Sequence, residues 1–314
     1  MLAAVGEAPA EVRAAVVVVH WGSRNNTLAC LRSVGESTLR PSPLVVVDNG
    51  TGTLTPENVA SAAPHAILLS LPENLGFGGG TNIGIRRALA EGANYVLLLN
   101  NDALLAPGCL AALVRVARRG SRIAAVGAKV LAMRQPNMLW MAYGRLTYRA
   151  ALVQLVGQGE IDEQQFNEVC EVDFVGGCSM LMTREAIEEV GLLDDRFFAY
   201  HEDLDWCTTA RRRGFRIVYA PDAEIAHQGE GSLGENGEAN AARYLSARNA
   251  VLFAKKHATL REWLRLSVTV GFSLPRAYLR GWRNGDTGTV RLLALGYRDG
   301  LLGRDVPYRL LGLR

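Results

Sequence analysis

Short apolar runs alternate with amphipathic stretches along the first hundred residues of the chain. Four runs rich in Val, Ile and Leu are typical of buried strands, at residues 14–19, 44–47, 66–69 and 95–99. Segments with helical spacing separate them, at residues 26–39, 56–63 and 84–91. Because strand and helix alternate at βαβ spacing, the pattern predicts an α/β fold with a doubly wound, mainly parallel sheet.

The pattern becomes less regular after Gly127. Residues 129–170 mix Met, Trp, Tyr and Gln without a clean period, and we expect loops and short strands there. The pattern then predicts a strand at 172–183, helices at 184–190 and 204–213, and short strands at 216–219 and 223–226. From residue 239 onward it is helical, with a break expected at Pro275 because proline lacks the N–H that continues a helix.

Composition places the chain among ordinary globular proteins. Of its 314 residues, 49% are hydrophobic and 21% are charged, which argues against disorder and allows a sizeable core. The five cysteines follow no metal-binding spacing and favour a reducing compartment. No stretch reaches the roughly 18 apolar residues that a membrane-spanning helix needs. Residues 1–13 lack the pattern of a signal peptide, and we expect a flexible tail there.

Polar side chains follow three of the four predicted strands. They are His20 and Trp21, then Asp48 and Asn49, then Asn100, Asn101 and Asp102. Ligands of α/β sheets bind beyond the carboxyl ends of parallel strands, so we expect these clusters to face one crevice. An aromatic ring there suits a nucleobase, and Asp48 suits a base N–H or a ribose hydroxyl. The carboxylate of Asp102 suits a divalent metal that holds phosphate, with a solvated turn as the alternative.

A glycine-rich segment occupies residues 72–84, with the sequence PENLGFGGGTNIG. Glycines let backbone N–H groups approach a phosphate closely, and a following helix start favours anions. Thr81 stands where the dinucleotide-binding pattern needs its third glycine, and the Lys-Ser/Thr ending of a P-loop is missing. These two absences count against a nicotinamide enzyme and an NTPase. A mobile surface loop is the alternative interpretation of the segment.

Acidic and aromatic residues lie together at 197–206, with the sequence FFAYHEDLDW. Glu202, Asp203 and Asp205 come at the start of a predicted helix, where the dipole favours negative charge, so simple capping is one interpretation. The flanking aromatics suit the wall of a pocket. A carboxylate in such a pocket would take a proton from an incoming hydroxyl.

Two further segments carry candidate chemistry. His227 follows a short strand, where it would complete a metal site with Asp102 or serve a structural role, as lone histidines more often do. The glycine-rich residues that follow it, 229–232, are typical of a flexible lid. Small residues at 175–179, VGGCS, would leave room for a substrate, with a packed sheet edge as the alternative.

With these motifs in order, the chain resembles the inverting family 2 glycosyltransferases of the GT-A fold, and among them the rhamnosyltransferase-like branch. The resemblance covers about residues 14–255. It is carried by VVVVHWGSRN, VVVDNGT, ENLGFGGGTNIGIRRA, YVLLLNNDALL, the stretch from VGGCSMLMTREAI to IAHQGEGS, and RYLSARN. It implies a catalytic domain at 14–255, with a nucleotide-sugar-binding half at 14–127 and an acceptor-binding half at 128–255. A basic amphipathic helical region follows at 256–314.

The resemblance implies roles for residues of the donor site. Asp48 matches the strand-end acid that contacts a uracil or thymine base. Asp102 matches the last acid of the family's metal motif, and His227 matches a histidine that can join it on Mg²⁺ or Mn²⁺. Asn100 replaces the first acid of that motif, so Asp102 is its only carboxylate.

The catalytic expectation centres on the Glu202-Asp203 pair, in which Asp203 matches the general base. The implied reaction is a single displacement. Asp203 takes a proton from an acceptor hydroxyl, whose oxygen attacks the anomeric carbon opposite the nucleotide. Besides Asp48 and Asn100, the expected substrate contacts are His20, Trp21, Asn49, Asn74, Gly76, Phe77, Gly78, Asn82, Asn101, Gly176, Gly177 and Trp206.

The implied donor is a dTDP- or UDP-sugar, with rhamnose as the first candidate, and the implied acceptor is a glycan or a lipid-linked sugar in cell-surface polysaccharide synthesis. Two alternatives stay open. A sugar-phosphate nucleotidyltransferase would carry a basic, glycine-rich signature after its first strand, which residues 20–23 lack. A non-catalytic nucleotide-sugar-binding module is disfavoured because Asp102, Asp203 and His227 occur together.

The C-terminal region is basic. Residues 255–314 hold twelve Lys and Arg against four Asp and Glu, with Trp263, Tyr278 and Trp282 interleaved. This composition suits the surface of an anionic membrane, with a helical cap or an oligomer contact as alternatives. No nucleic-acid-binding motif accompanies the charge, so we expect no nucleic-acid partner. We expect a cytoplasmic protein attached peripherally to the inner face of the cell membrane.

Overall fold

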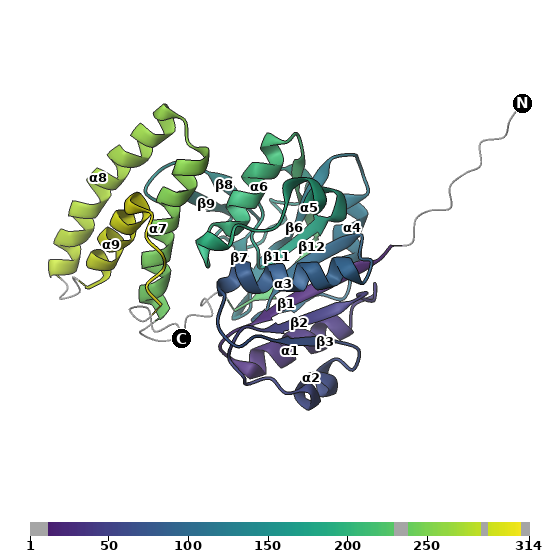
Figure 1. The fold of residues 1–314 in the computed structure, drawn as a ribbon. Helices are drawn as coiled ribbons and strands as arrows, with labels where there is room; N and C mark the ends of the chain where they lie inside the picture. The colour runs from purple at the N-terminus through teal and green to yellow at the C-terminus, as the bar shows by residue number, and fades with distance from the viewer. Residues whose placement is uncertain (1–11, 229–237, 284–287, 309–314) are drawn as a thin grey trace, which may run out of the picture.

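The structure is a computed structural model that describes residues 12–228, 238–283 and 288–308. A central sheet has helices on both faces, and a group of helices lies at one end of the molecule (Figure 1). The segment expected to form a lid, 229–232, and nearly all of the expected N-terminal tail lie outside the described residues.

Within the described residues the main sheet is mixed and has ten strands. Their order is β10-β12-β6-β11-β4-β1-β2-β3, with β5 beside β12 and β7 beside β6. The strands are β1 (Ala14–His20), β2 (Leu44–Asp48), β3 (Ile67–Ser70), β4 (Tyr95–Asn100), β5 (Ala103–Leu105), β6 (Ile123–Ala132), β7 (Gln135–Met141), β10 (Cys170–Glu171), β11 (Ser179–Thr183) and β12 (Arg216–His227). A separate hairpin joins β8 (Tyr143–Leu146) and β9 (Val153–Val156).

The first half of the sheet is parallel, as the apolar runs predict. Strands β2 and β4 flank β1, β3 pairs with β2, and all of these pairings are parallel. The carboxyl ends of these strands therefore meet at one edge of the sheet. Strand β11 runs antiparallel between β4 and β6, and β12 returns parallel to β6. The expected division of the catalytic domain at residue 127 falls within β6.

Alternate side chains of β1 enter the two layers of the core, because successive residues of a strand point to opposite faces. Ala14, Val16 and Val18 belong to one apolar cluster, and Ala15, Val17 and Val19 belong to the other. The first cluster is completed by α1 (Arg24–Gly35), α2 (Pro56–Ala62) and α4 (Cys109–Ala117). The second is completed by α3 (Gly76–Ala90), α5 (Arg184–Val190), α6 (Glu202–Arg212) and α7 (Glu238–His257).

The glycine-rich segment is mostly helix rather than loop, which corrects the prediction. Helix α3 begins at Gly76 instead of Gly84. A Cβ at Gly80 would stand 3.1 Å from Val19 of β1, and a Cβ at Gly84 would overlap the side chain of Val17. Gly80 and Gly84 therefore let α3 lie close against β1.

The second half of the main sheet differs from the prediction in two places. The strand expected at 172–183 is interrupted, because the Ser179 N–H donates to the Gly176 carbonyl and closes a turn before β11. The two short strands expected at 216–219 and 223–226 are one strand, β12, with a register shift between Ala220 and Glu224. Pro221 lies in this shift, where a missing N–H is tolerated.

Helices form the C-terminal region. Helix α8 (Leu260–Arg283) continues through Pro275, so the expected break there is wrong. Pro275 and Gly271, whose carbonyl loses its helical partner, are both exposed, and solvent can reach that carbonyl. Helix α9 (Gly288–Leu302) lies against α7, with Gly296 and Gly300 close to the backbone of that helix. Among the described helices, none is long and apolar enough to cross a membrane.

Candidate active site

A cavity of about 430 Å³ opens at the carboxyl edge of the parallel strands, and both halves of the chain line it. Its volume is in the range of small-molecule binding sites. The expected site residues that line it are Trp21, Asn49, Asn74, Gly76, Phe77, Asn100, Asn101, Gly176, Gly177, Glu202, Asp203 and His227. The fold therefore brings together segments that are far apart in the sequence.

Strand pairing brings Asp102 beside His227. Asp102 lies in the turn between β4 and β5, and His227 ends β12. Because β5 pairs antiparallel with β12, Ala103 is the register partner of His227. Asp102 Oδ1 lies 3.1 Å from His227 Nε2, and both side chains are buried.

This pair fits two ligands of a divalent cation. Neighbouring ligands of an octahedral ion at about 2.1 Å stand about 3 Å apart, which matches the separation of Asp102 Oδ1 and His227 Nε2. Asp102 Oδ1 is buried and accepts no hydrogen bond from the described residues. No third His, Cys, Asp or Glu of the described chain completes a metal-binding group. A cation there would need the rest of its ligands from water or a substrate.

Asn100, which the sequence analysis expects at the first acid of a metal motif, ends β4 beside His227. Its amide Nδ2 lies 3.2 Å from His227 Nε2, so the side chain faces the same corner of the cavity. An amide carries no charge, so the carboxylate at this corner is that of Asp102, which lies behind the lining residue His227. Trp140 packs its ring edge-on against His227, with ring centroids 4.8 Å apart.

Asp203 lies in the first turn of α6, at another part of the cavity. Its Oδ2 accepts a hydrogen bond from the Gly177 N–H at 2.8 Å, and its Oδ1 accepts one from the Leu204 N–H at 2.7 Å. Burial raises the pKa of Asp203, and these backbone N–H groups oppose that rise because they favour the ionised form.

Glu202, the neighbour of Asp203, has a different environment. Its side chain is buried, and Oε2 has no hydrogen-bond partner among the described residues. Burial, and then the Asp203 carboxylate, raise the pKa of Glu202 well above its ordinary value. Burial therefore favours the neutral form of Glu202. Asp203 instead accepts hydrogen bonds from two N–H groups, which stabilise a negative charge.

The small-residue segment connects these two parts of the cavity. Gly177 donates to Asp203, and the Cys178 carbonyl accepts from the Asn100 N–H at 3.2 Å. A Cβ at Gly176 would stand 2.8 Å from Met141, and a Cβ at Gly177 would stand 3.1 Å from Phe77. Glycine at both positions therefore keeps this part of the cavity open.

Asn49 and Asn74 shape the cavity wall at the start of α3. The Asn49 amide donates to Asn74 Oδ1 and to the Gly76 carbonyl, both at 3.0 Å, and Asn49 Oδ1 accepts from the Leu75 N–H. Asn101 donates to the Trp21 carbonyl at 2.9 Å. These amides fix backbone segments that line the cavity. The sequence alone does not distinguish this structural role from contact with a substrate.

Three expected substrate contacts lie behind the lining. His20 is buried between the hydroxyls of Thr27 and Thr53. Asp48 accepts hydrogen bonds from the N–H and the hydroxyl of Thr51. Gly78 lies within α3 and donates its N–H to the Phe198 carbonyl.

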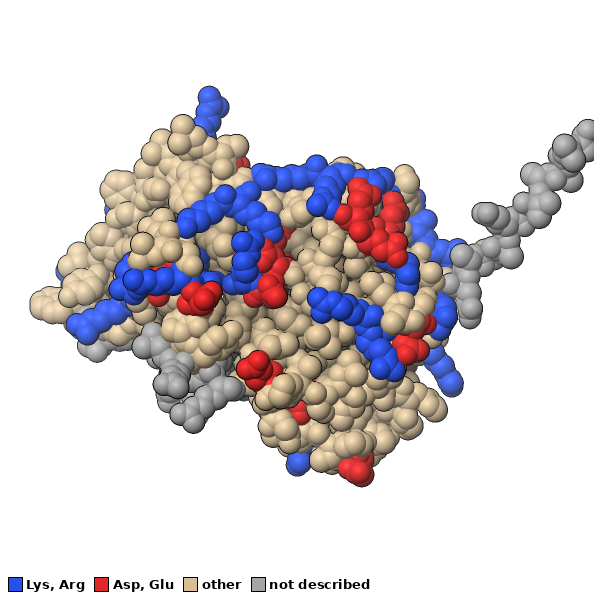
Figure 2. Space-filling view, in the orientation of Figure 1, with Lys and Arg blue, Asp and Glu red and all other residues tan. Residues whose placement is uncertain are grey.

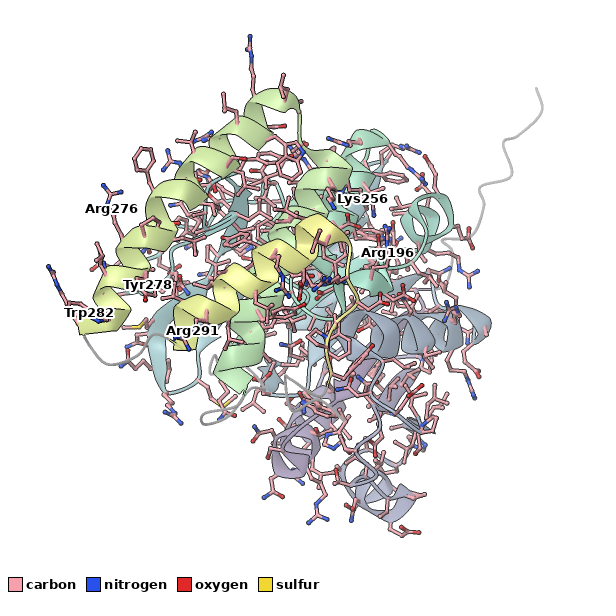
Figure 3. The ribbon with its side chains drawn as sticks, turned by 60° about the vertical axis from the view of Figure 1, so that its left-hand side comes forward. Arg196, Lys256, Arg276, Tyr278, Trp282 and Arg291 are labelled. Carbon is pink, nitrogen blue, oxygen red and sulfur yellow. The ribbon has the colours of Figure 1, made fainter. Side chains whose placement is uncertain are left out.

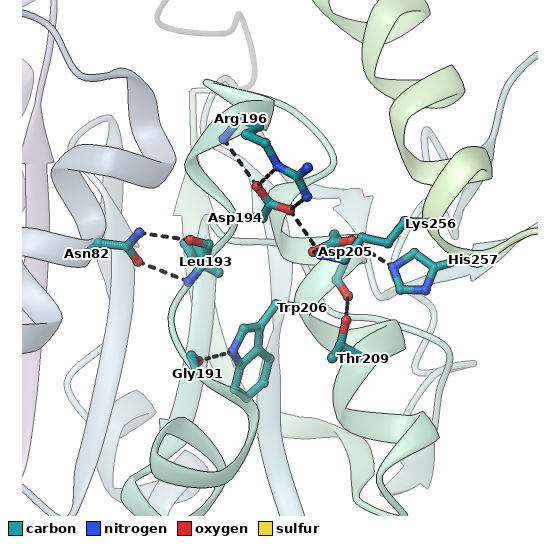
Figure 4. A network of polar contacts seen from close by, with 10 residues as sticks. All are labelled: Asn82, Gly191, Leu193, Asp194, Arg196, Asp205, Trp206, Thr209, Lys256 and His257. Atoms are coloured by element: carbon teal, nitrogen blue, oxygen red, sulfur yellow. Dashed lines mark hydrogen bonds and ion pairs between the residues drawn. The ribbon is translucent and has the colours of Figure 1, made fainter. Parts of the chain in front are cut away.

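Asn82 and Trp206 have packing roles in place of the expected substrate contacts. The Asn82 amide donates to the Leu193 carbonyl and accepts from the Leu193 N–H, so its hydrogen-bonding atoms are occupied (Figure 4). Trp206 is buried in the core, and its indole N–H donates to the Gly191 carbonyl. Both side chains fix the segment that leads toward residues 195–201.

An ionic network holds α6 against the end of α7. Asp205 Oδ2 pairs with Lys256 Nζ at 2.7 Å, and Asp205 Oδ1 lies 2.7 Å from His257 Nε2. Lys256 also pairs with Asp194, which Arg196 contacts from the other side (Figure 4). Asp205 is thus a structural acid, although it belongs to the same sequence cluster as Asp203.

The loop before α6 contributes Phe198 and Tyr200 to the cavity lining, as the flanking aromatics predicted, and its backbone conformation is unusual. Phe198, Tyr200 and His201 have positive φ angles of 64°, 69° and 70°. Asn249 of α7 donates to the carbonyls of Phe197, Ala199 and Tyr200, each at 2.8 Å. Arg248 and Asn249 form the adjacent polar pair at the end of the segment RYLSARN. Asn249 could have indicated this contact, because an amide on a largely buried helix needs hydrogen-bond partners.

His201 and an apolar wall complete the cavity. Burial lowers the pKa of His201 to about 4, so its imidazole is neutral near pH 7. The apolar wall comes largely from the irregular part of the sequence, 129–170, where no period pointed to it. Its members are Trp140, Met141, Val153, Leu155 and Phe174.

Comparisons with known proteins identify the family of this chain. Residues 10–247 match the family described as "Glycosyltransferase like family 2". The chain is 26% identical over 282 residues to N-acetylglucosaminyl-diphospho-decaprenol L-rhamnosyltransferase of Mycobacterium tuberculosis, covering 81% of this chain and 90% of that protein. It is 24% identical over 252 residues to dTDP-rhamnosyl transferase RfbF of Shigella flexneri, covering 77% and 80%.

Solved structures share the fold at low sequence identity. The mannosyltransferase PcManGT from Pyrobaculum calidifontis, in complex with GDP-Man and Mn²⁺, has a TM-score of 0.56 at 17% identity and covers 93% of this chain and 88% of its own. GalNAc-T7 with UDP, GalNAc and Mn²⁺ has a TM-score of 0.60 at 15% identity, and the match covers 78% of this chain and 48% of that one. The chain therefore belongs to the family 2 glycosyltransferases and is an enzyme with the GT-A fold.

Proposed function

We propose that this glycosyltransferase moves a sugar from a nucleoside-diphosphate donor to a hydroxyl of a glycan or lipid-linked acceptor, with inversion at the anomeric carbon. The observation that carries the proposal is the shared cavity. His227, next to Asp102, and the Glu202-Asp203 pair line or adjoin the same space from different elements. A cation-binding corner and a separate carboxylate are what a displacement of diphosphate by an alcohol requires.

In the proposed reaction Asp203 accepts the proton of the acceptor hydroxyl. The oxygen forms a bond to the anomeric carbon, and the bond from that carbon to the diphosphate oxygen breaks with its electron pair. The Gly177 and Leu204 N–H groups hold the Asp203 carboxylate in place before the transfer. Glu202 stays protonated beside it and keeps a second negative charge away from the base.

Asp102 and His227 are the proposed ligands of Mg²⁺ or Mn²⁺. The cation would neutralise negative charge that develops on the leaving diphosphate. Because Asp102 is the only carboxylate in that corner of the described cavity, we expect the protein alone to bind the cation weakly. The donor diphosphate would supply further ligands, so cation and donor should bind together.

The proposed donor is dTDP-rhamnose, with UDP-sugars as the second choice. Support for rhamnose comes from two relatives named as rhamnosyltransferases. Support for a lipid-linked acceptor comes from the relative whose name contains a diphospho-decaprenol. The apolar side chains of Trp140, Val153 and Leu155 provide a wall on which such an acceptor can pack. We propose that the enzyme works at the inner face of the cell membrane.

A thermal-shift panel tests this proposal. The protein is heated with UDP-, dTDP- and GDP-sugars, each with and without Mn²⁺. The proposal predicts that one nucleotide class raises the melting temperature, and that Mn²⁺ increases the rise, because a ligand stabilises the state that binds it. The best donor is then tested for transfer to lipid-linked acceptors. Absence of stabilisation by every nucleotide sugar would contradict the proposal.

A further inference from the structure

We propose that the outer face of α8 is a membrane-binding surface that inserts into the interface of an anionic lipid bilayer. This inference concerns where the enzyme acts, and it can be tested without any substrate. Failure of this inference can therefore be distinguished from failure of the proposed reaction. It develops the expectation of a basic C-terminal region into a defined face of one helix.

The outer face of α8 is mainly apolar from the start of the helix to its end. We call this face the α8 stripe, and its members are Leu260, Leu264, Val268, Phe272, Leu279 and Trp282. At 3.6 residues per turn they fall within about 120° of the helix circumference. All are exposed, with Leu264 at 65%, Phe272 at 63% and Trp282 at 68%. Large apolar side chains exposed in a continuous row mark an interaction surface.

The opposite side of α8 holds it to the protein. Leu266 is the buried residue of this helix, only 2% exposed, and it lies away from the α8 stripe. Figure 1 shows α8 at the outer edge of the molecule, with α9 and α7 between it and the sheet. The described part of the chain therefore leaves the stripe uncovered.

Four of the five arginines of α8 border the α8 stripe on one side, and Arg261 lies within the stripe at the start of the helix. The helix carries five arginines and one glutamate, so its side chains contribute a net charge of +4. The arginines are Arg261, Arg265, Arg276, Arg280 and Arg283. In Figure 2 the left-hand end of the molecule is mainly uncharged surface bordered by blue side chains. Figure 3 shows Arg276, Tyr278 and Trp282 along α8 and Arg291 on α9.

Anionic lipid is the occupant that these features favour. An amphipathic helix with basic residues beside an apolar face lies in the headgroup region of a bilayer, where Trp and Tyr rings also prefer to sit. Each basic residue near an anionic surface adds attraction. A second copy of the chain would instead bring the arginine row of one α8 near that of another, which like charge disfavours.

The position of α7 connects this surface to the cavity. Ala241 and Leu245 of α7 line the cavity, and α9 packs against the same helix. Packed helices lie roughly 8–10 Å apart. A bilayer in contact with α8 would therefore be about two helix layers from the cavity wall, close enough for an acceptor anchored in that bilayer.

Vesicle flotation of the full chain tests the inference. Vesicles of phosphatidylcholine with phosphatidylglycerol are compared with vesicles of phosphatidylcholine alone. We expect the wild type to bind the anionic vesicles. We expect the affinity of Leu264→Ser/Phe272→Ser for these vesicles to be at least about tenfold weaker, because both substitutions remove apolar area that the bilayer would bury. We expect a similar loss for Arg276→Glu/Arg280→Glu on anionic vesicles.

The matched control is Ile161→Ser/Val169→Ser, which changes two exposed apolar residues outside α8. Its binding should equal that of the wild type, and the melting temperature of each variant should confirm that it folds. Equal binding by the control and the α8 stripe variant would overturn the inference. Absence of binding to the anionic vesicles would also overturn it. A lipid-free dimer in sedimentation that Leu264→Ser/Phe272→Ser abolishes would then show that a second copy covers the stripe.

Discussion

At the scale of single residues, two adjacent carboxyl groups have different surroundings. Asp203 accepts two backbone N–H bonds, whereas Glu202 is buried with an oxygen that lacks a partner among the described residues. Hydrogen bonds to the charged form favour ionisation, and burial without them favours the neutral acid. The proposed base is therefore the residue whose charge the backbone stabilises.

This difference predicts unequal effects of two amide substitutions. Asp203→Asn removes the proton acceptor, and we expect transfer to fall by at least about 10²-fold, the usual contribution of a general base. Glu202→Gln puts a neutral amide where we propose a protonated acid, and we expect less than about a tenfold loss. Steady-state transfer rates with saturating donor compare the two variants. A larger loss for Glu202→Gln than for Asp203→Asn would reverse the assignment.

The pH dependence of transfer follows from the raised pKa of Asp203. The base must be ionised, so kcat/KM should fall as the pH drops through that pKa. Because burial raises the pKa, the acidic limb of the profile should lie above about pH 4, the ordinary range of an aspartate. A pH–rate profile from about pH 4 to 8 measures this limb. An acidic limb at or below the ordinary aspartate range would argue against Asp203 as the buried base.

At the scale of secondary-structure elements, the site depends on how closely helices approach the sheet. Helix α3 lies against β1 through Gly80 and Gly84, and its first residues line the cavity. A side chain at Gly84 would overlap Val17 in the core. The position of the cavity wall is thus set by the absence of side chains at this contact.

We therefore expect Gly84→Ala to destabilise the fold by about 1–3 kcal/mol, the usual cost of overpacking a core. Gly35→Ala is the matched control, since Gly35 ends helix α1 and has open space where its Cβ would lie. Denaturant unfolding compares the free energies of unfolding of both variants with that of the wild type. Equal stability of Gly84→Ala and Gly35→Ala would show that the contact relaxes without cost.

A second element-level contact fixes the loop before α6. Asn249 of α7 bonds to three carbonyls in residues 197–200, next to backbone positions with positive φ. Positive φ costs energy for residues other than glycine, so the loop needs partners that hold it. Asn249 therefore positions the segment that leads into the Glu202-Asp203 pair without touching the acids in any described hydrogen bond.

We expect Asn249→Ala to lower kcat by at least about tenfold while donor affinity changes little, because a small misplacement of a catalytic group has a large effect on rate. Lys255→Ala is the control, since it removes hydrogen bonds from the same helix to the Gly300 and Leu301 carbonyls. Rates and calorimetric donor affinities of both variants separate the two effects. Equal kcat for the two variants would mean that the loop keeps its geometry without Asn249.

At the scale of the whole molecule, the sequence predicts the first half of the fold better than the second. The apolar runs of β1, β2 and β4 are buried on both faces, so composition alone marks them as parallel strands, whereas the edge strand β3 is only partly buried. The proximity of Asp102 and His227 depends on β5, a strand of three residues with no readable period. The proximity of Asp102 and His227 could be expected only from the resemblance to a family.

Two of the expected substrate contacts that do not line the cavity, Asn82 and Trp206, are explained by one physical cause. Asn82 and Trp206 are residue types that suit a pocket as well as a core, and each satisfies its polar atoms with backbone groups distant in sequence. Asp205 has the same ambiguity, because its partners Lys256 and His257 come from the far end of α7. Local pattern cannot separate these cases, since only the folded chain decides which polar groups meet.

The whole-molecule account assigns the cavity two parts, a cation-binding corner at Asp102 and a proton acceptor at Asp203. The most direct test is calorimetric titration of the donor's nucleoside diphosphate in the presence of Mn²⁺. We expect Asp102→Ala to weaken binding by at least about tenfold, or about 1.4 kcal/mol, and Asp203→Asn to bind as the wild type does. Unchanged affinity in Asp102→Ala, or an equal loss in both variants, would contradict the account.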